Sequence, residues 1–420
     1  MNSIINFKNF NLLLLFFLPI GIILGQFELN LAIFLITSLF LIDFFINKKK
    51  NTFYKDKIFL CFLLFFIFIF INSIFFFDQN LKQLSKSFAI LISAIFIYAL
   101  GNSLEQQDKK NLKNLIFFYL FLNIFIYFDL IYQFLNPNFK DFLGFKVETL
   151  RTYEIFGNKK ILPLRLSGPF KEELVPGFYL STFGSIVIFL TYFKTNLRYK
   201  NIFLLYTLLF INLFFVILTG ERSSSIISFL ILILFIFYIE KNIYKNIFYF
   251  LFLLSAIVII VKINPTTGER MNDILFWLSK ENGGVKGFFS TDWGRHYLIS
   301  FEIFKDHIFF GSGIRSFREI CTIYELKLSI SGCSSHPHNY ILELLSETGL
   351  FGFIIFLSIF CIILKENLSK NRNALSVGLF IVLFCYLFPV RPTGAIFSSW
   401  HGGFLYIIIG LNLFFLRNKK

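Results

Sequence analysis

Long apolar runs separated by short polar segments extend along the whole chain. Windows of roughly 17–23 apolar residues, long enough to cross the hydrocarbon core of a bilayer, recur from one end to the other. The pattern is typical of an all-α integral membrane protein with about twelve transmembrane helices. The predicted spans lie near residues 9–25, 28–47, 58–77, 86–102, 115–136, 174–193, 201–218, 223–240, 246–263, 339–364, 374–390 and 403–416.

Two polar segments are longer than the others. One covers residues 137–173, and the larger covers residues 264–338, between the predicted ninth and tenth helices. The larger segment contains enough apolar residues for short helices, so it could pack over the membrane face as a small cap. The sequence has no internal repeat and no low-complexity linker, and residues 1–420 are therefore interpreted as a single polytopic membrane domain.

Composition and charge fit this class of protein. The chain is 56% hydrophobic and 20% aromatic, with 65 Phe residues, which soluble domains do not show. Its formal charge of +15 comes from clusters of Lys and Arg in short loops rather than from one basic surface, which argues against nucleic-acid binding.

The basic clusters occupy alternate short loops, which predicts the orientation by the positive-inside rule. Both termini are expected in the cytoplasm, and the segments 137–173 and 264–338 on the opposite side. The cytoplasmic clusters are Lys48 to Lys50 with Lys55 and Lys57, Lys109 with Lys110 and Lys113, Lys194 with Arg198 and Lys200, Lys241 with Lys245, Lys365 with Lys370 and Arg372, and Arg417 with Lys419 and Lys420.

The cysteines fall into two groups. Cys61, Cys361 and Cys385 lie within apolar runs, where a thiol behaves as a small buried side chain. Cys321 and Cys333 lie in one polar loop, which allows a disulfide if that loop is outside the cytoplasm. No Cys or His spacing fits a zinc site, so we expect no structural metal.

The segment His336-Pro337-His338-Asn339 closes the longest polar stretch and opens a long apolar one. On a helix that begins at Asn339, the side chains of Asn339, Glu343 and Glu347 share one face. Charged groups that enter a bilayer are functional candidates by default. The alternative is an ordinary helix start, in which Asn339 caps and the carboxylates suit the helix dipole.

Three arginines lie at predicted helix ends on the same side as this segment: Arg165, Arg222 and Arg295. A guanidinium holds phosphate oxygens through two parallel hydrogen bonds at any relevant pH, and a neutral His338 could take a proton from a hydroxyl. Together they indicate a site for a lipid-linked pyrophosphate. Each arginine alone has a simpler interpretation. Arg222 could snorkel to the membrane surface, Arg295 could be a solvated residue of an ordinary loop helix, and Arg165 could anchor its loop.

These residues resemble the O-antigen ligase and polymerase superfamily, which are bacterial inner-membrane glycosyltransferases. His338-Asn339, nine further residues, Gly349, two residues and Gly352 fit the ligase motif without a gap. Arg222 in Thr-Gly-Glu-Arg is similar to the Arg turn of the family, with Glu221 in place of the usual Ser. Arg295, followed by an amphipathic segment and Gly311-Ser-Gly313, looks like a further family element, with Ile308 where Pro is usual. Arg165-Leu-Ser-Gly-Pro-Phe is similar to an earlier one.

The resemblance implies an inverting, metal-independent transfer without a cofactor at the periplasmic face. The donor would be a glycan on undecaprenyl pyrophosphate, and the acceptor a hydroxyl of lipid A-core. Arg222 and Arg295 would hold the pyrophosphate and His338 would be the base, with His336 as the competing candidate. Asn339, Glu343, Glu347 and Arg165 would support the site.

Two alternatives remain open at this stage. A polymerase of the same superfamily would use a second lipid-linked repeat unit as acceptor, and the loop 137–173 is large enough for that reading. A twelve-span transporter should carry polar groups at the bilayer midplane, whereas here the centres of the predicted spans are nearly free of charge.

Overall fold

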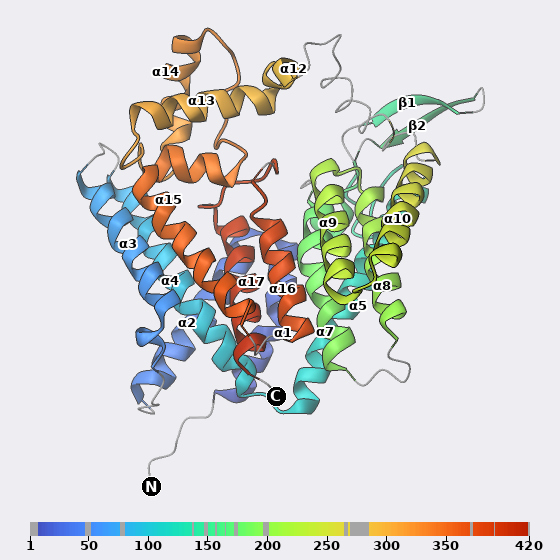
Figure 1. Cartoon of the computed structure of the whole chain (residues 1–420), viewed down its shortest axis with the longest axis horizontal. Helices are drawn as coiled ribbons and strands as arrows, with labels where there is room; N and C mark the ends of the chain where they lie inside the picture. The colour runs from blue at the N-terminus through green and yellow to red at the C-terminus, as the bar shows by residue number, and fades with distance from the viewer. Residues whose placement is uncertain are drawn as a thin grey trace. The chain divides into compact units, whose positions relative to one another are not determined.

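The computed structural model of the chain is predominantly helical (Figure 1). It describes residues 7–46, 52–75, 80–136, 138–146, 150–155, 158–163, 165–171, 175–195, 201–263, 268, 285–369, 373–389 and 391–418. Backbone contacts group them into two compact units. The first is made of Met1–Asp108, Leu278–Ser376 and Leu387–Lys420, and the second of Lys109–Trp277 and Val377–Tyr386. The interpretation of residues 1–420 as one domain stays a prediction.

The first unit contains a bundle of long apolar helices and a set of shorter ones. The long helices are α1 (Lys8–Leu24), α2 (Gln26–Ile46), α3 (Lys57–Phe75), α4 (Asn80–Glu105), α15 (Tyr340–Asn367) and α17 (Ser399–Arg417). The shorter elements are η1 (Phe53–Lys55), α12 (Val285–Phe289), α13 (Asp292–Asp306) and α14 (Phe317–Leu328). Within the bundle, α3 packs on α4 and α15, and α17 packs on α2 and α4.

The helices α13 and α14 form a small cap on α15 (Figure 1). Ile299 and Ile303 of α13 pack against Phe317 and Tyr324 of α14, and all four side chains are buried. Both helices are amphipathic, because their other faces carry ion pairs such as Lys305 with Glu302. The segment 285–338 thus folds into short helices, whereas residues 264–267 and 269–284 of the predicted loop lie outside the described residues.

The second unit contains the other helices. They are α5 (Lys109–Leu135), η2 (Gly168–Phe170), α6 (Pro176–Tyr179), η3 (Leu180–Gly184), α7 (Ser185–Lys194), α8 (Ile202–Leu218), α9 (Arg222–Ile239), α10 (Ile243–Ile263) and most of α16 (Ala374–Tyr386). The elements α6, η3 and α7 form one apolar stretch with a π turn at Leu180–Gly184. Buried Asn212 donates to the carbonyl of Leu180 at 2.9 Å, which also accepts from the backbone N–H of Ser185, so α8 is tied to the π turn.

The expectation of an all-α fold needs one correction. Strands β1 (Leu150–Ile155) and β2 (Asn158–Pro163) pair antiparallel as a hairpin, with Leu150 opposite Pro163. The hairpin lies within the polar segment 137–173, which the sequence predicts as a loop. A two-residue connection lets adjacent strands satisfy each other's backbone groups without further sequence signal.

The predicted spans correspond to helices at nearly the same positions. Among the described residues, eight helices are long and apolar enough to cross a membrane, and the chain is a multi-pass membrane protein. The apolar helices α1, α8 and α16 are shorter, and so is the apolar stretch Ile243–Ile259 of α10. The count of twelve crossings and the orientation stay predictions.

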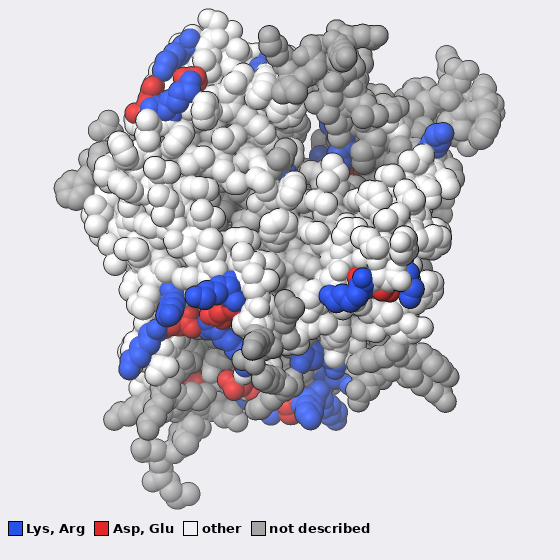
Figure 2. All heavy atoms as spheres, in the orientation of Figure 1, with Lys and Arg blue, Asp and Glu red and all other residues white. Residues whose placement is uncertain are grey.

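Charged side chains of the first unit gather at its two ends. On the left of Figure 2, they cluster at the top and at the bottom, and the surface between is almost uncharged. At one end Lys327 pairs with Asp306 at 2.8 Å, and at the other Arg417 pairs with Asp56 and Glu366 at 2.6 and 2.7 Å. Exposed apolar side chains such as Phe351 and Ile354 cover the middle, as expected for a surface that faces lipid.

Candidate active site

Helix α15 is broken one residue before Leu350. Gly349 takes φ 64° and ψ −169°, so the turns on either side cannot exchange all their usual hydrogen bonds. The loop 308–313 supplies them instead, and its backbone docks on the break. Four backbone hydrogen bonds join the two segments: Ser312 N to Ser346 O at 2.8 Å, Gly313 N to Glu347 O at 2.9 Å, Leu350 N to Ile308 O at 2.7 Å and Phe351 N to Phe309 O at 3.2 Å.

Two glycines allow this docking: Gly349 at the helix break and Gly311 in the loop 308–313. A Cβ on Gly349 would lie 2.5 Å from the backbone of Gly311 and Phe309, and a Cβ on Gly311 would lie 2.4 Å from the backbone of Glu347. Both glycines also have positive φ. Only residues without a side chain permit such a close approach of two backbones in these conformations. Gly349 of the motif and Gly311 of the loop therefore have a structural role, which is the junction of the cap with α15.

The start of α15 is capped by its own first side chain. The Asn339 Oδ1 accepts hydrogen bonds from the backbone N–H groups of Ile341 and Leu342 at 3.0 and 3.1 Å. Its amide nitrogen donates to the carbonyl of Pro389 at 2.6 Å. Such a cap stabilises a helix by about 1 kcal/mol. Asn339 also ties the 387–398 segment to α15.

Glu343 and Glu347 are buried and accept hydrogen bonds from two loops. Glu343 Oε2 accepts from Ile396 N at 2.8 Å. Glu347 accepts from the backbone N–H of Arg315 at 2.5 Å and of Phe317 at 3.4 Å. Carboxylates bonded to backbone N–H groups at these positions hold the two loops in place. The pair thus has a structural role that the sequence pattern alone does not distinguish from a catalytic one.

Three imidazoles and one indole gather beside the start of α15. The ring of His338 lies 3.9 Å from that of His336, 5.0 Å from that of His296 and 4.6 Å from that of Trp293, centroid to centroid. His296 and Trp293 belong to α13, so the cap and α15 both contribute to this cluster. His338 lies between the other two histidines and takes φ 58°. A non-glycine residue in this region is strained, which is common at functional sites.

The hydrogen-bond partners of the ring nitrogens distinguish the two candidate bases, and both rings donate to the carbonyl of Thr393. It accepts a hydrogen bond from Nδ1 of His338 at 3.1 Å and from Nε2 of His336 at 3.3 Å. Because a carbonyl only accepts, each of these ring nitrogens carries the proton. His336 Nδ1 bonds the hydroxyl of Ser335 at 2.9 Å. Among the described residues, Nε2 of His338 has no hydrogen-bond partner, and its lone pair is available.

Burial keeps these imidazoles neutral. It lowers the pKa of His338 to about 3, with further contributions from His336 and His296. It lowers the pKa of His336 to about 4, where the charges of Arg318 and Arg315 add to the effect. At any pH between 5 and 8 the ring of His338 in the free chain is therefore unprotonated, and its Nε2 keeps a lone pair.

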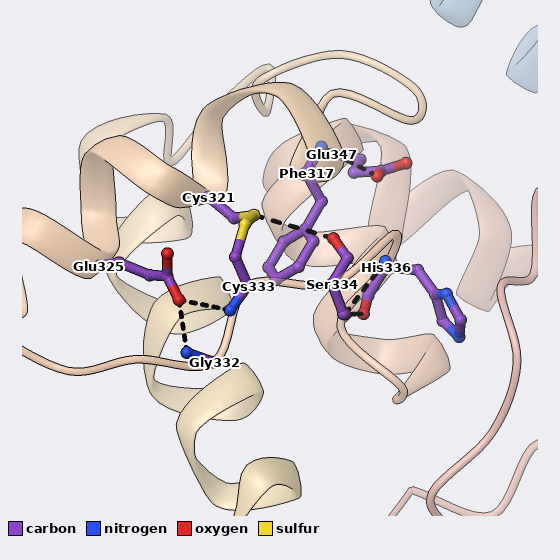
Figure 3. Close-up of a disulfide and its surroundings, with 8 residues drawn as sticks. All are labelled: Phe317, Cys321, Glu325, Gly332, Cys333, Ser334, His336 and Glu347. Atoms are coloured by element: carbon purple, nitrogen blue, oxygen red, sulfur yellow. Dashed lines mark hydrogen bonds between the residues drawn. A yellow bond between two sulfur atoms is a disulfide. The ribbon is translucent and has the colours of Figure 1, made fainter.

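A disulfide stabilises the segment that leads from α14 to His336. Cys321 of α14 is joined to Cys333, and their Cα atoms are 5.6 Å apart (Figure 3). The carboxylate of Glu325 accepts from the backbone N–H of Gly332 and of Cys333. Figure 3 shows the His336 ring pointing away from the disulfide, beyond Ser334. The segment that carries His336 is thus tied to α14 at two points.

Replacing both Cys321 and Cys333 by Ser is expected to lower the free energy of unfolding by about 3 kcal/mol, the value for a closed loop of this size. The measurement is the thermal unfolding midpoint of the detergent-solubilised chain with and without a reducing agent. The exposed free thiol of Cys361 provides the control, because Cys361→Ser should change nothing. An unchanged midpoint in the double variant would show that the bond contributes no stability.

The predicted cations fall into both units. In the first, Arg295 pairs with Asp292 and donates to the hydroxyl of Ser331 at 3.0 Å, and its buried Nε has no hydrogen-bond partner among the described residues. In the second, Arg222 begins α9 and Arg165 lies 3.9 Å from the carboxylate of Glu221. The first unit contains His336, His338, Asn339, Glu343, Glu347 and Arg295. Within it, Arg295 acts electrostatically on His296, whose ring lies 5.0 Å from that of His338. The convergence of Arg222 with them stays a prediction.

Sequence reasoning missed four residues of the site. His296 and Trp293 lie in the segment that follows Thr291, and only their position beside Arg295 was a signal. Thr393 acts through its carbonyl oxygen, which no side-chain pattern reveals. Arg315, with φ 59° in the Gly-Ser-Gly-Ile-Arg loop, could have been noted as one more cation next to a glycine turn.

Among the residues that the structure describes, no group of three or more His, Cys, Asp or Glu side chains is arranged to hold a metal ion. Residues 207–357 match a family model described as O-antigen ligase. The match includes α9, the cap and the His338 motif. No curated protein matches the chain.

Proposed function

We propose that this chain is an O-antigen ligase. It moves a glycan from undecaprenyl pyrophosphate to a hydroxyl of lipid A-core. The match of residues 207–357 to the O-antigen ligase family model supports the ligase and polymerase superfamily of membrane glycosyltransferase-like enzymes. The observation that most supports the transfer reaction is the open Nε2 of His338, whose tautomer the Thr393 carbonyl fixes. The ligase motif from His338-Asn339 to Gly352 favours lipid A-core as the acceptor.

The proposed reaction is one inverting displacement. His338 Nε2 takes the proton of the acceptor hydroxyl, and the oxygen attacks the anomeric carbon of the donor. The bond from that carbon to the pyrophosphate oxygen breaks, and the pyrophosphate leaves with the electron pair. Arg222 and Arg295 neutralise its charge. The guanidinium of Arg295 would act by its charge, since Asp292 and Ser331 already engage its two terminal nitrogens.

The proposed location is the bacterial inner membrane, with both termini in the cytoplasm and the site at the periplasmic face. The disulfide between Cys321 and Cys333 supports this orientation, because such bonds persist outside the cytoplasm. The distribution of basic loops supports it independently.

A polymerase of the same superfamily is the second candidate. It would use the same donor and the same base, with a lipid-linked repeat unit as acceptor. The hairpin of β1 and β2 supports this candidate, because it gives the segment 137–173 a folded element for contact with a long glycan.

A transfer assay on the purified chain in lipid nanodiscs tests the proposal. The donor is undecaprenyl pyrophosphate-linked glycan, offered with lipid A-core or with a second lipid-linked repeat unit, in the presence of EDTA. We expect glycan on lipid A-core, and activity without divalent metal, since fixed guanidinium groups neutralise the leaving group. Transfer only to the repeat unit would assign the polymerase reaction, and no transfer to either acceptor would contradict both.

The pH dependence of transfer should differ between free enzyme and complex. Because burial holds the pKa of His338 near 3, kcat/KM is expected to stay level from pH 8 down to about 5. A bound pyrophosphate favours the protonated ring and raises that pKa, so the acidic limb of kcat should lie at higher pH than that of kcat/KM. An acidic limb of kcat/KM near pH 6.5 would contradict the buried, neutral base.

A further inference from the structure

A cavity of about 320 Å³ opens in the first unit between α2, α4 and α17. Its wall is mostly apolar, with Ile33, Phe34 and Ile90 among the lining side chains, and Lys86 is the basic residue in it. The segment 396–398 closes one side, and the buried carboxylate of Glu343 holds that segment through Ile396 N. An apolar cavity with one cation in its wall fits a hydrocarbon chain that carries an anionic head.

Lys86 belongs to a group of three cations. Arg315 and Arg318 both repel the Lys86 ammonium, so the three charges lie within electrostatic range of one another. Arg315 is half-buried and Arg318 is exposed. Among the described residues, none of these three side chains has a hydrogen-bond or ion-pair partner. Three cations within electrostatic range of one another and without bonded counter-ions create a positive potential that attracts an anion.

The two carboxylates that act electrostatically on Arg315 do not pair with it. Glu343 and Glu347 lie within electrostatic range of Arg315, but both are buried and bind backbone N–H groups instead. No salt bridge joins them to Arg315 in the described part of the chain. Even with both carboxylates ionised, the three cations leave an excess of positive charge.

Arg295 and the group of three cations act on different histidines next to His338. The His338 ring lies between those of His296 and His336, at 5.0 and 3.9 Å. Arg295 acts electrostatically on His296, whereas Arg315 and Arg318 act on His336. The proposed base therefore has one cation on its His296 side and a separate cationic group on its His336 side.

We propose that Lys86, Arg315 and Arg318 bind a phosphate group of the acceptor glycolipid, and that a hydrocarbon chain of this lipid enters the cavity between α2, α4 and α17. This inference rests on the proposed transfer reaction, in which Arg222 and Arg295 serve the donor. A base that joins two anionic lipid-linked substrates needs a separate anion site for each. The acceptor is thus selected for its phosphate as well as for its hydroxyl.

The test begins with binding, so that it does not depend on turnover. His338→Asn chain in nanodiscs is titrated with lipid A-core that carries its phosphates, or with the same lipid after phosphatase treatment. A variant with Lys86→Gln, Arg315→Gln and Arg318→Gln is compared with a control with Lys305→Gln and Lys327→Gln, two cap lysines that already have carboxylate partners. We expect at least a tenfold weaker Kd for the triple variant and an unchanged Kd for the control.

Removal of the phosphates should weaken binding to the chain with its three cations intact, and should have no further effect on the triple variant. In the active background, the triple substitution should raise KM for the acceptor and leave KM for the donor unchanged. A raised donor KM would overturn the proposal and assign the cations to the donor. Equal displacement of lipid A-core by phosphatidylglycerol would overturn it as well, since the site would then be a general lipid contact. Phosphate-dependent binding together with no transfer by the unsubstituted chain would leave the anion site standing and remove the proposed function.

Discussion

Replacing His338 by Asn is expected to reduce the rate constant of glycan transfer by roughly 10²–10⁴-fold, the contribution of a positioned general base. Asn tolerates the left-handed backbone that His338 adopts at φ 58°, so the substitution removes the imidazole with little added strain. The lost group is Nε2, the ring nitrogen left open by the hydrogen bond of Nδ1 to Thr393. Single-turnover transfer with saturating donor measures the effect.

The matched control is His336→Asn. Both ring nitrogens of His336 already have partners, in Thr393 and Ser335, so we expect a much smaller loss than for His338. A larger loss at His336 than at His338 would reverse the assignment of the base. Normal glycan ladders in cells that express the His338 variant would remove the base altogether.

Replacing Gly349 by Ala is expected to destabilise the chain by at least about 3 kcal/mol and to lower the yield of folded protein strongly. The new Cβ would lie 2.5 Å from the backbone of Gly311 and Phe309 at a residue with φ 64°. Neither neighbour can give way, because the loop 308–313 is bonded to both sides of the helix break. Size-exclusion profiles and thermal unfolding of the solubilised chain report the effect.

The expected loss at Gly349 has two causes, the clash of the new Cβ and the positive φ. The variant Gly144→Ala separates them. Gly144 also has positive φ, at 88°, but no atom lies within 4 Å of a Cβ built there. Its substitution carries only the backbone cost of roughly 1–2 kcal/mol. If both variants lost the same stability, the docking of the cap on α15 would contribute nothing, and the structural account of the glycine motif would be wrong.

The helices could be predicted from sequence because membrane spans follow a local rule. A run of apolar residues of sufficient length forms a helix whatever lies elsewhere in the chain, and α3 and α9 begin within a residue of the predicted spans. The hairpin of β1 and β2 is not visible in this way, because its strands carry no long apolar run. Its identification depends on pairing between two segments.

The candidate site was only partly predictable. His338 and Asn339 stand out because a polar motif precedes an apolar run, and the two cysteines because they share one polar loop. His296 and Thr393 approach His338 through tertiary packing of residues 42 and 55 positions away, which single-sequence patterns do not contain. The role of Glu347 was ambiguous for the same reason, since its partners are backbone groups of a distant loop.

The most direct test of the central claim is an electron cryo-microscopy map of the chain in nanodiscs with undecaprenyl pyrophosphate bound. We predict pyrophosphate density in contact with both Arg222 and Arg295, next to the open Nε2 of His338. Pyrophosphate bound at a distance from His338, or an Arg222 that lies on a different face from His338, would contradict the proposed enzyme mechanism.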